Sequence, residues 1–503
     1  MIEYSLEKAR KYEEEQEKKI PGGDRPVFHF TPRVGWTNDP NGFSYYGGKY
    51  HLFYQYNPYD VVWNSMHWGH AVSSDLLRWE YLPAALAPDR EYDSFGCFSG
   101  SAVETDSGEH LLMYTGVRKD EQGREFQVQC VATGDGENYS KYSCNPVIDV
   151  ESLPEGFDPA NFRDPKIWRT EDGGYRCIAA AKDSAGLGVL LLFSSEDGFK
   201  WKYEGIPVRN DGSFGRMWEC PDFFFLDGKA VILVSPQDMR PRGNEFFNGN
   251  GTLCRIGTFC EEEKRFIPEA DQAIDVGIDF YAPQTLLAPD GRRIMIAWMQ
   301  NWDTCSSLGY TPHDWFGQMC IPRELFIREG RLYQRPVKEF EALRGEKAAY
   351  KNVIVGGKGQ NSAVRESAIR LEGIAGRCAD IELELYPAEG KEPCHVFEMS
   401  FAEDQTHRSV LRYRPFENLL ETDRRESGSR RGHLQQRSCK VADRGGRISL
   451  RIILDRYSAE VFVNGGEQVM TTAILTDQTA TGISFSAIGC AAMDIVKYDI
   501  KQA

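Results

Sequence analysis

The sequence is dominated by a long series of short apolar or alternating runs, most of which end at a Gly, Asp or Asn. The series extends from Val27 to about Arg335, and nothing in it has the apolar spacing of an amphipathic helix. Clear examples are 49–54, 110–114, 188–193, 229–234 and 293–298. Turn pairs such as Asp227-Gly228 and Asp290-Gly291 stand directly before runs of this kind, as in β-hairpins. The pattern predicts a large all-β unit.

The spacing of these runs suggests a repeated architecture. Comparable strand-rich units recur about every 50 to 60 residues, which gives roughly five units. Repeated four-stranded units without a helical period are typical of a β-propeller. A β-sandwich is the competing all-β interpretation, but a segment of about 300 residues is long for one. We therefore expect a five-bladed β-propeller over residues 26–335.

Two further regions flank this unit. Residues 5–19 have the pattern of a short helix that stops at Pro21-Gly22, so we expect an N-terminal helical extension over 1–25. Residues 336–349 suggest a short helix and linker. After Tyr350 a second strand-rich stretch begins, with alternating runs at 368–372, 380–385, 448–454 and 459–463. Its length and alternation predict a C-terminal β-sandwich over 350–503.

Charge and composition exclude several classes of protein. The net charge of −16 argues against a nucleic-acid partner, which would require a basic surface. No window reaches the roughly 18 uninterrupted apolar residues of a membrane span. The charged N-terminal segment lacks the apolar core of a signal peptide, so we expect a cytoplasmic protein. The 13 cysteines are scattered without a CxxC pair, which favours free thiols over a disulfide framework or zinc site.

Three carboxylates stand in unusual local settings, each in a different unit of the repeat. They are Asp39 in Trp36-Thr37-Asn38-Asp39-Pro40-Asn41-Gly42, Asp164 in Asn161-Phe162-Arg163-Asp164-Pro165, and Glu219 in Met217-Trp218-Glu219-Cys220-Pro221. Proline restricts the residue before it, and an apolar, aromatic setting favours a protonated carboxyl group, which suits a general acid. Taken singly, each motif is also typical of a turn or an exposed strand end.

Together the three carboxylates indicate a catalytic site. In a propeller the inner strands converge on one axial cavity, so acids far apart in the sequence meet there. Two carboxylates on either side of a sugar bond are what glycoside hydrolysis needs. Aromatic residues make up 12% of the chain, and many stand beside hydrogen-bonding side chains, as sugar-binding sites require. Most of these rings are nevertheless expected in the core.

The motif around Asp39 resembles the signature of glycoside hydrolase family 32, the invertase and β-fructofuranosidase family. Further motifs resemble that family in order and spacing: Phe53–Pro58, Trp63, Met66–Ala71, Phe98–Ala102, Arg163–Pro165, Glu219–Pro221, Asp279–Gln284, Trp298–Gln300 and Pro322–Leu325. The resemblance covers residues 26–330 and continues more weakly at Asp423-Arg424 and Glu460–Asn464. It implies an all-β fold, a five-bladed propeller followed by a sandwich.

The resemblance also implies a retaining hydrolysis of terminal β-fructosyl units. Asp39 would be the nucleophile that attacks the anomeric C2, and Glu219 would act first as acid and then as base. Asp164 would bind fructose hydroxyls and stabilise the oxocarbenium-like transition state, with the carboxyl groups of Asp39 and Glu219 about 5–5.5 Å apart. The fructose subsite would be lined by Asn38, Gln55, Trp63, Phe98, Ser99, Arg163, Tyr281 and Trp298. No metal or organic cofactor is needed, because two carboxylates and water carry the chemistry.

Several alternatives stay open at this point. Sucrose, sucrose 6-phosphate and short fructo-oligosaccharides all present a terminal fructosyl unit, and a fructosyltransferase would use the same residues. A phosphorylated substrate would need a cationic pocket, for which the candidates are Arg90, Lys166, Arg216 and Arg242. A five-bladed enzyme acting on pentose polymers, or a carbohydrate-binding propeller without activity, agrees less well with the motifs. A homo-oligomer is compatible with the sequence, and the thiols of Cys97 and Cys220 are expected near the pocket.

Overall fold

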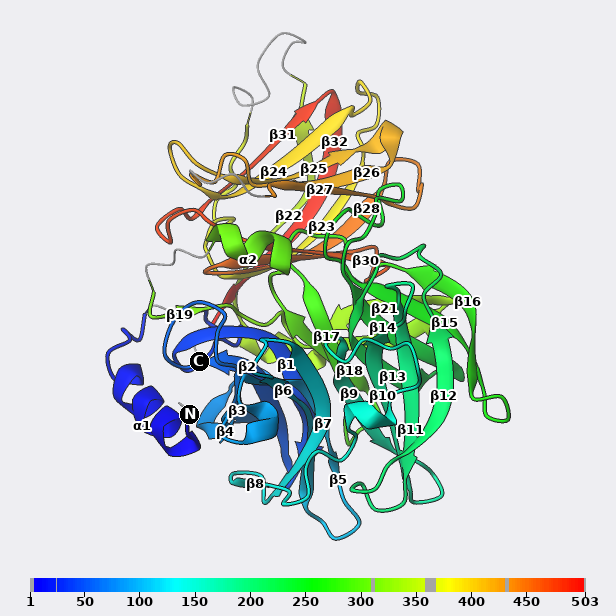
Figure 1. The fold of residues 1–503 in the computed structure, drawn as a ribbon. Helices are drawn as coiled ribbons and strands as arrows, with labels where there is room; N and C mark the ends of the chain where they lie inside the picture. The colour runs from blue at the N-terminus through cyan, green and yellow to red at the C-terminus, as the bar shows by residue number, and fades with distance from the viewer. Residues whose placement is uncertain (1–3, 24, 309–312, 358–367, 430–433, 502–503) are drawn as a thin grey trace.

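The computed structural model describes residues 4–23, 25–308, 313–357, 368–429 and 434–501. Two β domains lie against each other, with the first domain in blue to green and the second in yellow to red (Figure 1). The helix α1 (Leu6–Glu17) packs beside the first domain, where Glu13 accepts a hydrogen bond from the backbone of Ala84. In the part of the chain described, no helix is long and apolar enough to cross a membrane.

The first domain consists, within the described residues, of five antiparallel sheets in chain order. The first holds β1 (Gly35–Tyr46), β2 (Lys49–Asn57), β3 (His67–Ser73) and β4 (Glu80–Leu86), and the second holds β5 (Gly96–Glu104), β6 (His110–Lys119), β7 (Glu125–Gly134) and β8 (Tyr139–Lys141). The third holds β9 (Phe162–Arg169), β10 (Tyr175–Lys182), β11 (Gly188–Ser195) and β12 (Lys202–Arg209). The fourth holds β13 (Trp218–Leu226), β14 (Lys229–Pro236), β15 (Leu253–Cys260) and β16 (Arg265–Gln272), and the fifth holds β17 (Tyr281–Leu287), β18 (Arg293–Trp298), β20 (Arg323–Arg328) and β21 (Arg331–Pro336).

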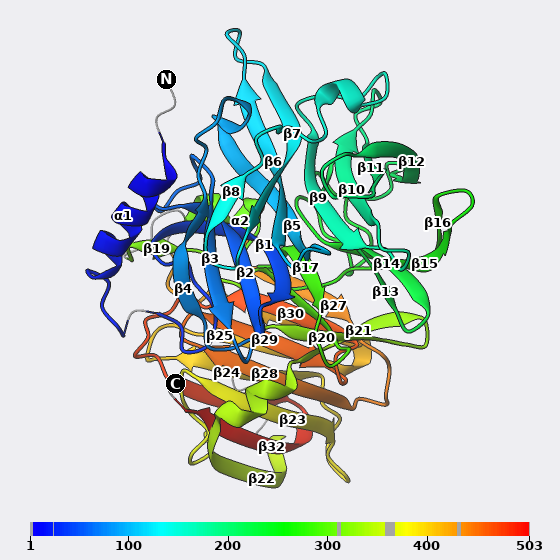
Figure 2. The same cartoon turned by 90° about the horizontal axis from the view of Figure 1, so that it is seen from below.

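The first strands of the five sheets form a closed ring. β1 contacts β5, β5 contacts β9, β9 contacts β13, β13 contacts β17, and β17 returns to β1. The short strand β19 (Trp315–Phe316) pairs in parallel with β1 and so ties the fifth sheet to the first. These sheets radiate from a common axis, as the blades of a propeller do. Figure 2 shows both domains from below.

Each strand of the inner ring has an irregularity close to its beginning. The register with the neighbouring strand shifts at Thr37/Pro40 in β1, Phe98/Gly100 in β5, Arg163/Lys166 in β9, Glu219/Asp222 in β13 and Tyr281/Gln284 in β17. In three of these strands the residue at the shift has a positive φ: 61° at Asp164, 47° at Cys220 and 52° at Ala282. Such β-bulges turn side chains out of the regular alternation. All five bulges occur at the same end of the ring, where the predicted motifs lie.

The second domain is a sandwich of two sheets. The larger sheet has the order β22 (Arg344–Gly356), β32 (Cys490–Ile500), β23 (Ala379–Pro387), β28 (Ile448–Asp455), β29 (Ser458–Val463) and β30 (Gln468–Ala473). The smaller has the order β27 (Gln436–Lys440), β26 (Leu419–Asp423), β25 (Ser409–Arg414), β24 (Val396–Glu403) and β31 (Gly482–Ile488). Alternate apolar residues of both sheets, such as Ile381, Phe397 and Phe485, form the core between them.

Two details differ from the expectations. The segment 336–349 contains a short 3-10 helix (Lys338–Leu343), but β22 already begins at Arg344. This edge strand is half exposed and begins with Arg-Gly-Glu-Lys, so its start carries no alternating signal. The run 368–372 is not a strand: only Ile369 bridges to Phe485, because a turn at Glu372-Gly373 follows at once.

Buried charges join the two domains. His29 lies between two carboxylates of the sandwich, with its Nδ1 2.8 Å from Asp455 and its Nε2 2.9 Å from Glu460. Arg323 of the propeller binds Glu460 at 2.5 Å and Asp275 at 3.0 Å. All five side chains are fully buried. Each charge therefore depends on a partner, and most of these partners belong to the other domain.

Candidate active site

The axial cavity opens at the end of the ring where the bulges lie and has a volume of about 560 Å³. It brings together nine of the eleven residues selected from the sequence, supplied by four inner strands (β1, β5, β9 and β13) and by the segments beside them. These are Asn38, Asp39, Gln55, Trp63, Phe98, Ser99, Arg163, Asp164 and Glu219. The three carboxylates come from β1, β9 and β13, so the ring converts a separation of up to 180 positions into direct proximity.

Asp39 is held by two donors on one of its oxygens. The Ser99 hydroxyl donates to Oδ2 at 2.6 Å, and the Cys220 thiol donates to the same oxygen at 3.3 Å. The other oxygen, Oδ1, has no partner among the described residues. Burial raises the pKa of Asp39, the hydrogen bond from Ser99 opposes the rise, and the Glu219 carboxylate adds to it. One carboxylate oxygen is thus fixed while the other is available for chemistry.

Asp164 occupies its bulge in a left-handed conformation that few residues other than Gly and Asn adopt. Its Oδ2 accepts a hydrogen bond from the backbone N–H of Cys220 at 2.9 Å, and its own N–H donates to Thr115 Oγ1 at 2.9 Å. Burial raises the pKa of Asp164 to about 7, against the attraction of Arg163 and with the repulsion of Glu219. Cys220 therefore touches both aspartates, through its thiol and its backbone.

Glu219 is bound on both oxygens. Arg163 donates to Oε1 from Nε at 3.2 Å and from Nη2 at 3.0 Å. The Tyr281 hydroxyl donates to Oε2 at 2.7 Å and lies 3.0 Å from the carbonyl oxygen of Ser235. Arg163 also reaches Asn161 at 3.1 Å through Nη1. These contacts hold the carboxyl group in one orientation beside the two aspartates, which suits an acid and base that acts on a bound substrate.

Three of the remaining predicted residues have supporting contacts of their own. Asn38 accepts a hydrogen bond from the indole of Trp36 at 2.8 Å. Gln55 donates to the carbonyl oxygen of Cys97 at 3.0 Å. Trp63 packs edge to face on Phe98 at 5.8 Å and keeps 39% of its surface exposed. Trp63 thus offers an aromatic surface to a sugar at the cavity wall.

Tyr281 and Trp298 do not line the cavity. Tyr281 is fully buried behind Glu219, which it orients. Trp298 is also fully buried and packs against Trp36 at 6.0 Å and Trp302 at 5.1 Å. The expectation of a place in the lining of the fructose subsite is therefore corrected for Tyr281 and also for Trp298. It ends β18, the second strand of its sheet, whereas Trp302 in the following segment reaches the cavity.

Sequence reasoning did not select the outer residues of the cavity. They are Glu125, Gln127, Ala160, Asn161, Gln237, Asp238, Asn250 and Trp302. Most stand in connections or at the start of a third strand, without an aromatic or proline motif around them. Position relative to the motifs could have found several of them: Asn161 is the first residue of the Asp164 motif, and Gln237-Asp238 follow the strand paired with the Glu219 strand.

None of the four cations considered for a phosphate, Arg90, Lys166, Arg216 and Arg242, is among the described residues that line this cavity. Lys166 is buried and binds Asp222 at 3.0 Å. Arg242 lies over the ring of Phe214 at 4.5 Å. Arg90 lies beside Asp89, at 4.0 Å.

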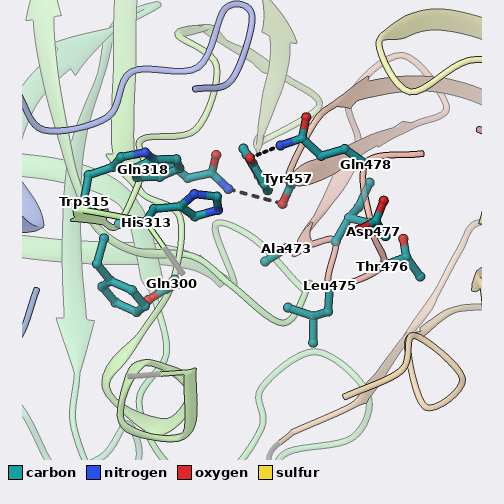
Figure 3. A pocket seen from close by; sticks show the side chains of 13 residues that line it. Gln300, His313, Trp315, Gln318, Tyr457, Ala473, Leu475, Thr476, Asp477 and Gln478 are labelled. Carbon is teal, nitrogen blue, oxygen red and sulfur yellow. Dashed lines mark hydrogen bonds between the residues drawn. The ribbon is translucent and has the colours of Figure 1, made fainter. Parts of the chain in front are cut away.

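A second cavity, of about 450 Å³, lies between the propeller and the sandwich (Figure 3). Gln318 donates to the carbonyl oxygen of Tyr457 at 3.4 Å, and Gln478 donates to the Tyr457 hydroxyl. His313 stacks on Trp315 at this seam, with ring centres 5.0 Å apart. The cavity contains no residue of the carboxylate cluster. The carboxylate cluster thus lies in the axial cavity and not in this one.

Comparison with known families gives a match over nearly the whole chain. Residues 29–336 match the glycosyl hydrolases family 32 N-terminal domain, and residues 339–502 match the family 32 C-terminal domain. The chain is 36% identical over 468 residues to a raffinose invertase of Escherichia coli, which covers 92% of each protein. It is also 36% identical over 465 residues to a sucrose-6-phosphate hydrolase of Escherichia coli, which covers 89% of each.

Solved structures agree with this match. A family 32 β-fructofuranosidase of Bombyx mori superposes with a TM-score of 0.82 at 31% identity, covering 99% of this chain and 98% of that one. A sucrose-6-phosphate hydrolase of Lactobacillus gasseri superposes with a TM-score of 0.83 at 25% identity, covering 99% and 100%. The similarity extends over both domains.

Proposed function

The chain belongs to glycoside hydrolase family 32, and from this premise we propose that it is a retaining β-fructofuranosidase. It hydrolyses terminal β-D-fructosyl units of sucrose and short fructo-oligosaccharides. The observation that carries the proposal is the contact set of Cys220, which joins Asp39 and Asp164 in one cluster beside Glu219. The relatives named as invertases and β-fructofuranosidases support the substrate class.

In the first step the glycosidic bond breaks and a fructosyl-enzyme bond forms. Oδ1 of Asp39, the oxygen without a partner among the described residues, attacks the anomeric C2 of the fructosyl unit. Glu219 transfers a proton to the leaving oxygen, so that the partner sugar departs as an alcohol. Ser99 and Cys220 hold Oδ2 during the attack, which fixes the direction of the nucleophile.

In the second step water releases fructose. Glu219, now a carboxylate stabilised by Arg163 and Tyr281, removes a proton from water as the oxygen attacks C2. The bond to Asp39 breaks and the carboxylate is restored, so that configuration is retained. Asp164 binds hydroxyl groups of the fructosyl ring and stabilises the positive charge that develops there.

The same proposal includes the location of the enzyme and its use of small sugars. All 13 cysteines are free thiols, which supports a reducing, cytoplasmic compartment. A cytoplasmic enzyme acts on imported sugars, so short fructosides are favoured over intact polymers. The open rim of the cavity is compatible with sugar acceptors as well as water, so transfer products belong among the analytes of the test.

The test measures fructose and its partner sugar released from equal concentrations of sucrose, kestose and inulin. The wild-type enzyme is compared with Asp39→Ala and Glu219→Gln, and with the matched surface variant Glu171→Gln as a control. We expect release by the wild-type and control enzymes and a loss of at least about a thousandfold in the two site variants. With β-fructosyl fluoride as the donor, whose leaving group needs no proton, intact mass spectrometry of Glu219→Gln should detect an added fructosyl unit, which Asp39→Ala should lack. A folded wild-type enzyme that releases no fructose would falsify the proposal.

A further inference from the structure

The bottom and the rim of the axial cavity are formed by different strands. Asp39 and Asp164 lie at the bottom, on the inner ring, and are nearly inaccessible to solvent. Glu125 and Asp238 lie at the rim and are half-buried and exposed, respectively. Glu125 begins β7, the third strand of its sheet, and Asp238 follows β14, the second strand of another. The rim is therefore the region that receives the sugar attached to the fructosyl unit.

The charges of the rim have one sign. Besides the two carboxylates, this wall carries the amides of Asn161, Gln237 and Asn250, which can donate to and accept from sugar hydroxyls. Arg163 is the one positively charged side chain among the described residues that line the cavity. Its Nε and Nη2 already bind Glu219, so its charge is engaged within the catalytic cluster.

We infer that the leaving-group region selects an uncharged sugar, and that Glu125 and Asp238 discriminate against a phosphorylated one. This inference rests on the proposed function, because it assigns the rim to the leaving group. A phosphate monoester carries a charge of about −1.5 to −2 at neutral pH and is normally bound by Arg or Lys. Here it would meet two carboxylates, and repulsion of a competing ligand is an effective source of specificity.

The geometry of the two acids also determines which substitutions test them. Asp238 has a φ of 56°, a conformation that Asn tolerates well, so Asp238→Asn removes the charge and keeps the backbone. Glu125 lies at the start of a regular strand and accepts a hydrogen bond from Gln127 at 2.8 Å, which a glutamine oxygen can still accept. Glu171, exposed in the turn after β9, provides a matched control at the other end of its sheet.

The experiment compares kcat/KM for sucrose and for sucrose 6-phosphate in the wild-type enzyme at low ionic strength. We expect a preference for sucrose of about tenfold or more. Equal or better use of sucrose 6-phosphate overturns the inference while leaving the proposed function intact. If the enzyme releases no fructose from sucrose, sucrose 6-phosphate or kestose, the proposed function is overturned instead.

The variants then test the residues. Asp238→Asn and Glu125→Gln should each lower the ratio of the two kcat/KM values about threefold, and Glu171→Gln should leave it unchanged. Raising the salt concentration to about 0.5 M should shrink the ratio in the wild-type enzyme, because it screens exposed charges. A preference for sucrose that neither rim variant reduces overturns the assignment to these two residues.

Discussion

The hydroxyl of Ser99 lies 2.6 Å from Oδ2 of Asp39, across the contact between two inner strands of the propeller. Burial favours the neutral form of the Asp39 carboxyl group and so raises its pKa. This hydrogen bond favours the ionised form, so it opposes the effect of burial. The proposed nucleophile therefore depends on a residue supplied by the neighbouring blade. The same bond also selects which oxygen of Asp39 is available to the substrate.

Ser99→Ala should weaken the nucleophile without unfolding the protein. A hydrogen bond to a charged acceptor contributes about 1.5–3 kcal/mol, which corresponds to a loss of roughly 10- to 100-fold in kcat/KM. The acid limb of the pH profile should move to higher pH, because the pKa of Asp39 loses an opposing contribution. The exposed Ser107→Ala variant serves as the control for both measurements. An unchanged profile in Ser99→Ala would contradict the role of this bond.

The pKa of Asp164, raised to about 7, should be visible in the dependence of activity on pH. Its carboxylate is the form that accepts hydrogen bonds from fructose hydroxyls, so kcat/KM should fall as the pH decreases through about 7. Asp164→Asn should lower kcat/KM by about a hundredfold or more and abolish that limb. Arg163→Met should move the limb upward, because Arg163 opposes the rise of this pKa. A downward movement would refute the assignment.

Mercury salts should partly inactivate the enzyme through Cys220. Its sulfur lies 3.3 Å from Oδ2 of Asp39, so a metal bound there would disturb the nucleophile. Burial raises the pKa of the Cys220 thiol well above its usual range, so alkylation by iodoacetamide should be slow. Cys220→Ser should protect activity, whereas Cys144→Ser, which removes an exposed thiol, should not. Cys97 is fully buried behind Gln55, and Cys97→Ser should protect little. If mercury still inactivates Cys220→Ser, the metal acts through another residue.

The stability of the protein should decrease at alkaline pH because of His29. Burial alone would lower the pKa of His29, but hydrogen bonds and charges from Asp455 and Glu460 raise it to about 9. A pKa above that of the unfolded chain means that the contribution is complete below about pH 6.5 and is lost as the pH rises through 9. A rise from 6.5 to about 9 corresponds to roughly 3 kcal/mol.

Thermal unfolding at pH 6 and pH 9 measures this effect. The wild-type protein should lose stability between the two values, and His29→Gln should be less stable at pH 6 but show a smaller change. The surface variant His407→Gln is the control, because this histidine is half exposed and lies within the sandwich. Equal pH dependence in wild type and His29→Gln would show that other groups are responsible.

The outer strands of the blades could be predicted from the sequence, whereas the inner strands could not. Continuous apolar runs mark 110–114 and 229–234, which lie inside β6 and β14, the second strands of their sheets. The catalytic motifs suggested turns, because a proline normally argues against a strand interior. Pro40, Pro165, Pro221 and Pro283 all stand inside inner strands, at the bulges, where ladder pairing is interrupted. The unusual composition of these motifs indicated a function, but for the same reason the motifs were predicted as turns instead of strands.

The carboxylate cluster could be selected from local composition and family resemblance, but the wall around it could not. Glu125 and Asp238 have ordinary neighbours, and their proximity to Asp39 depends on how far each blade turns about the axis. Trp298 shows the opposite case, since it stands in a recognisable motif but packs behind Trp36. Strand register and blade orientation determine which residues line the cavity. Both arise from long-range strand pairing rather than from the local sequence pattern.

The buried charges between the domains bear on how such a chain can be rearranged. The apolar core below the first blade also includes Ile453, Phe462 and Val469 of the sandwich. A propeller cut off after β21 would expose the apolar surface that Ile453, Phe462 and Val469 cover, and it would leave His29 without either of its carboxylate partners and Arg323 without Glu460. The sandwich therefore cannot be exchanged for another module by recombination without loss of these contacts. The two domains can be inherited, transplanted or redesigned only as a pair.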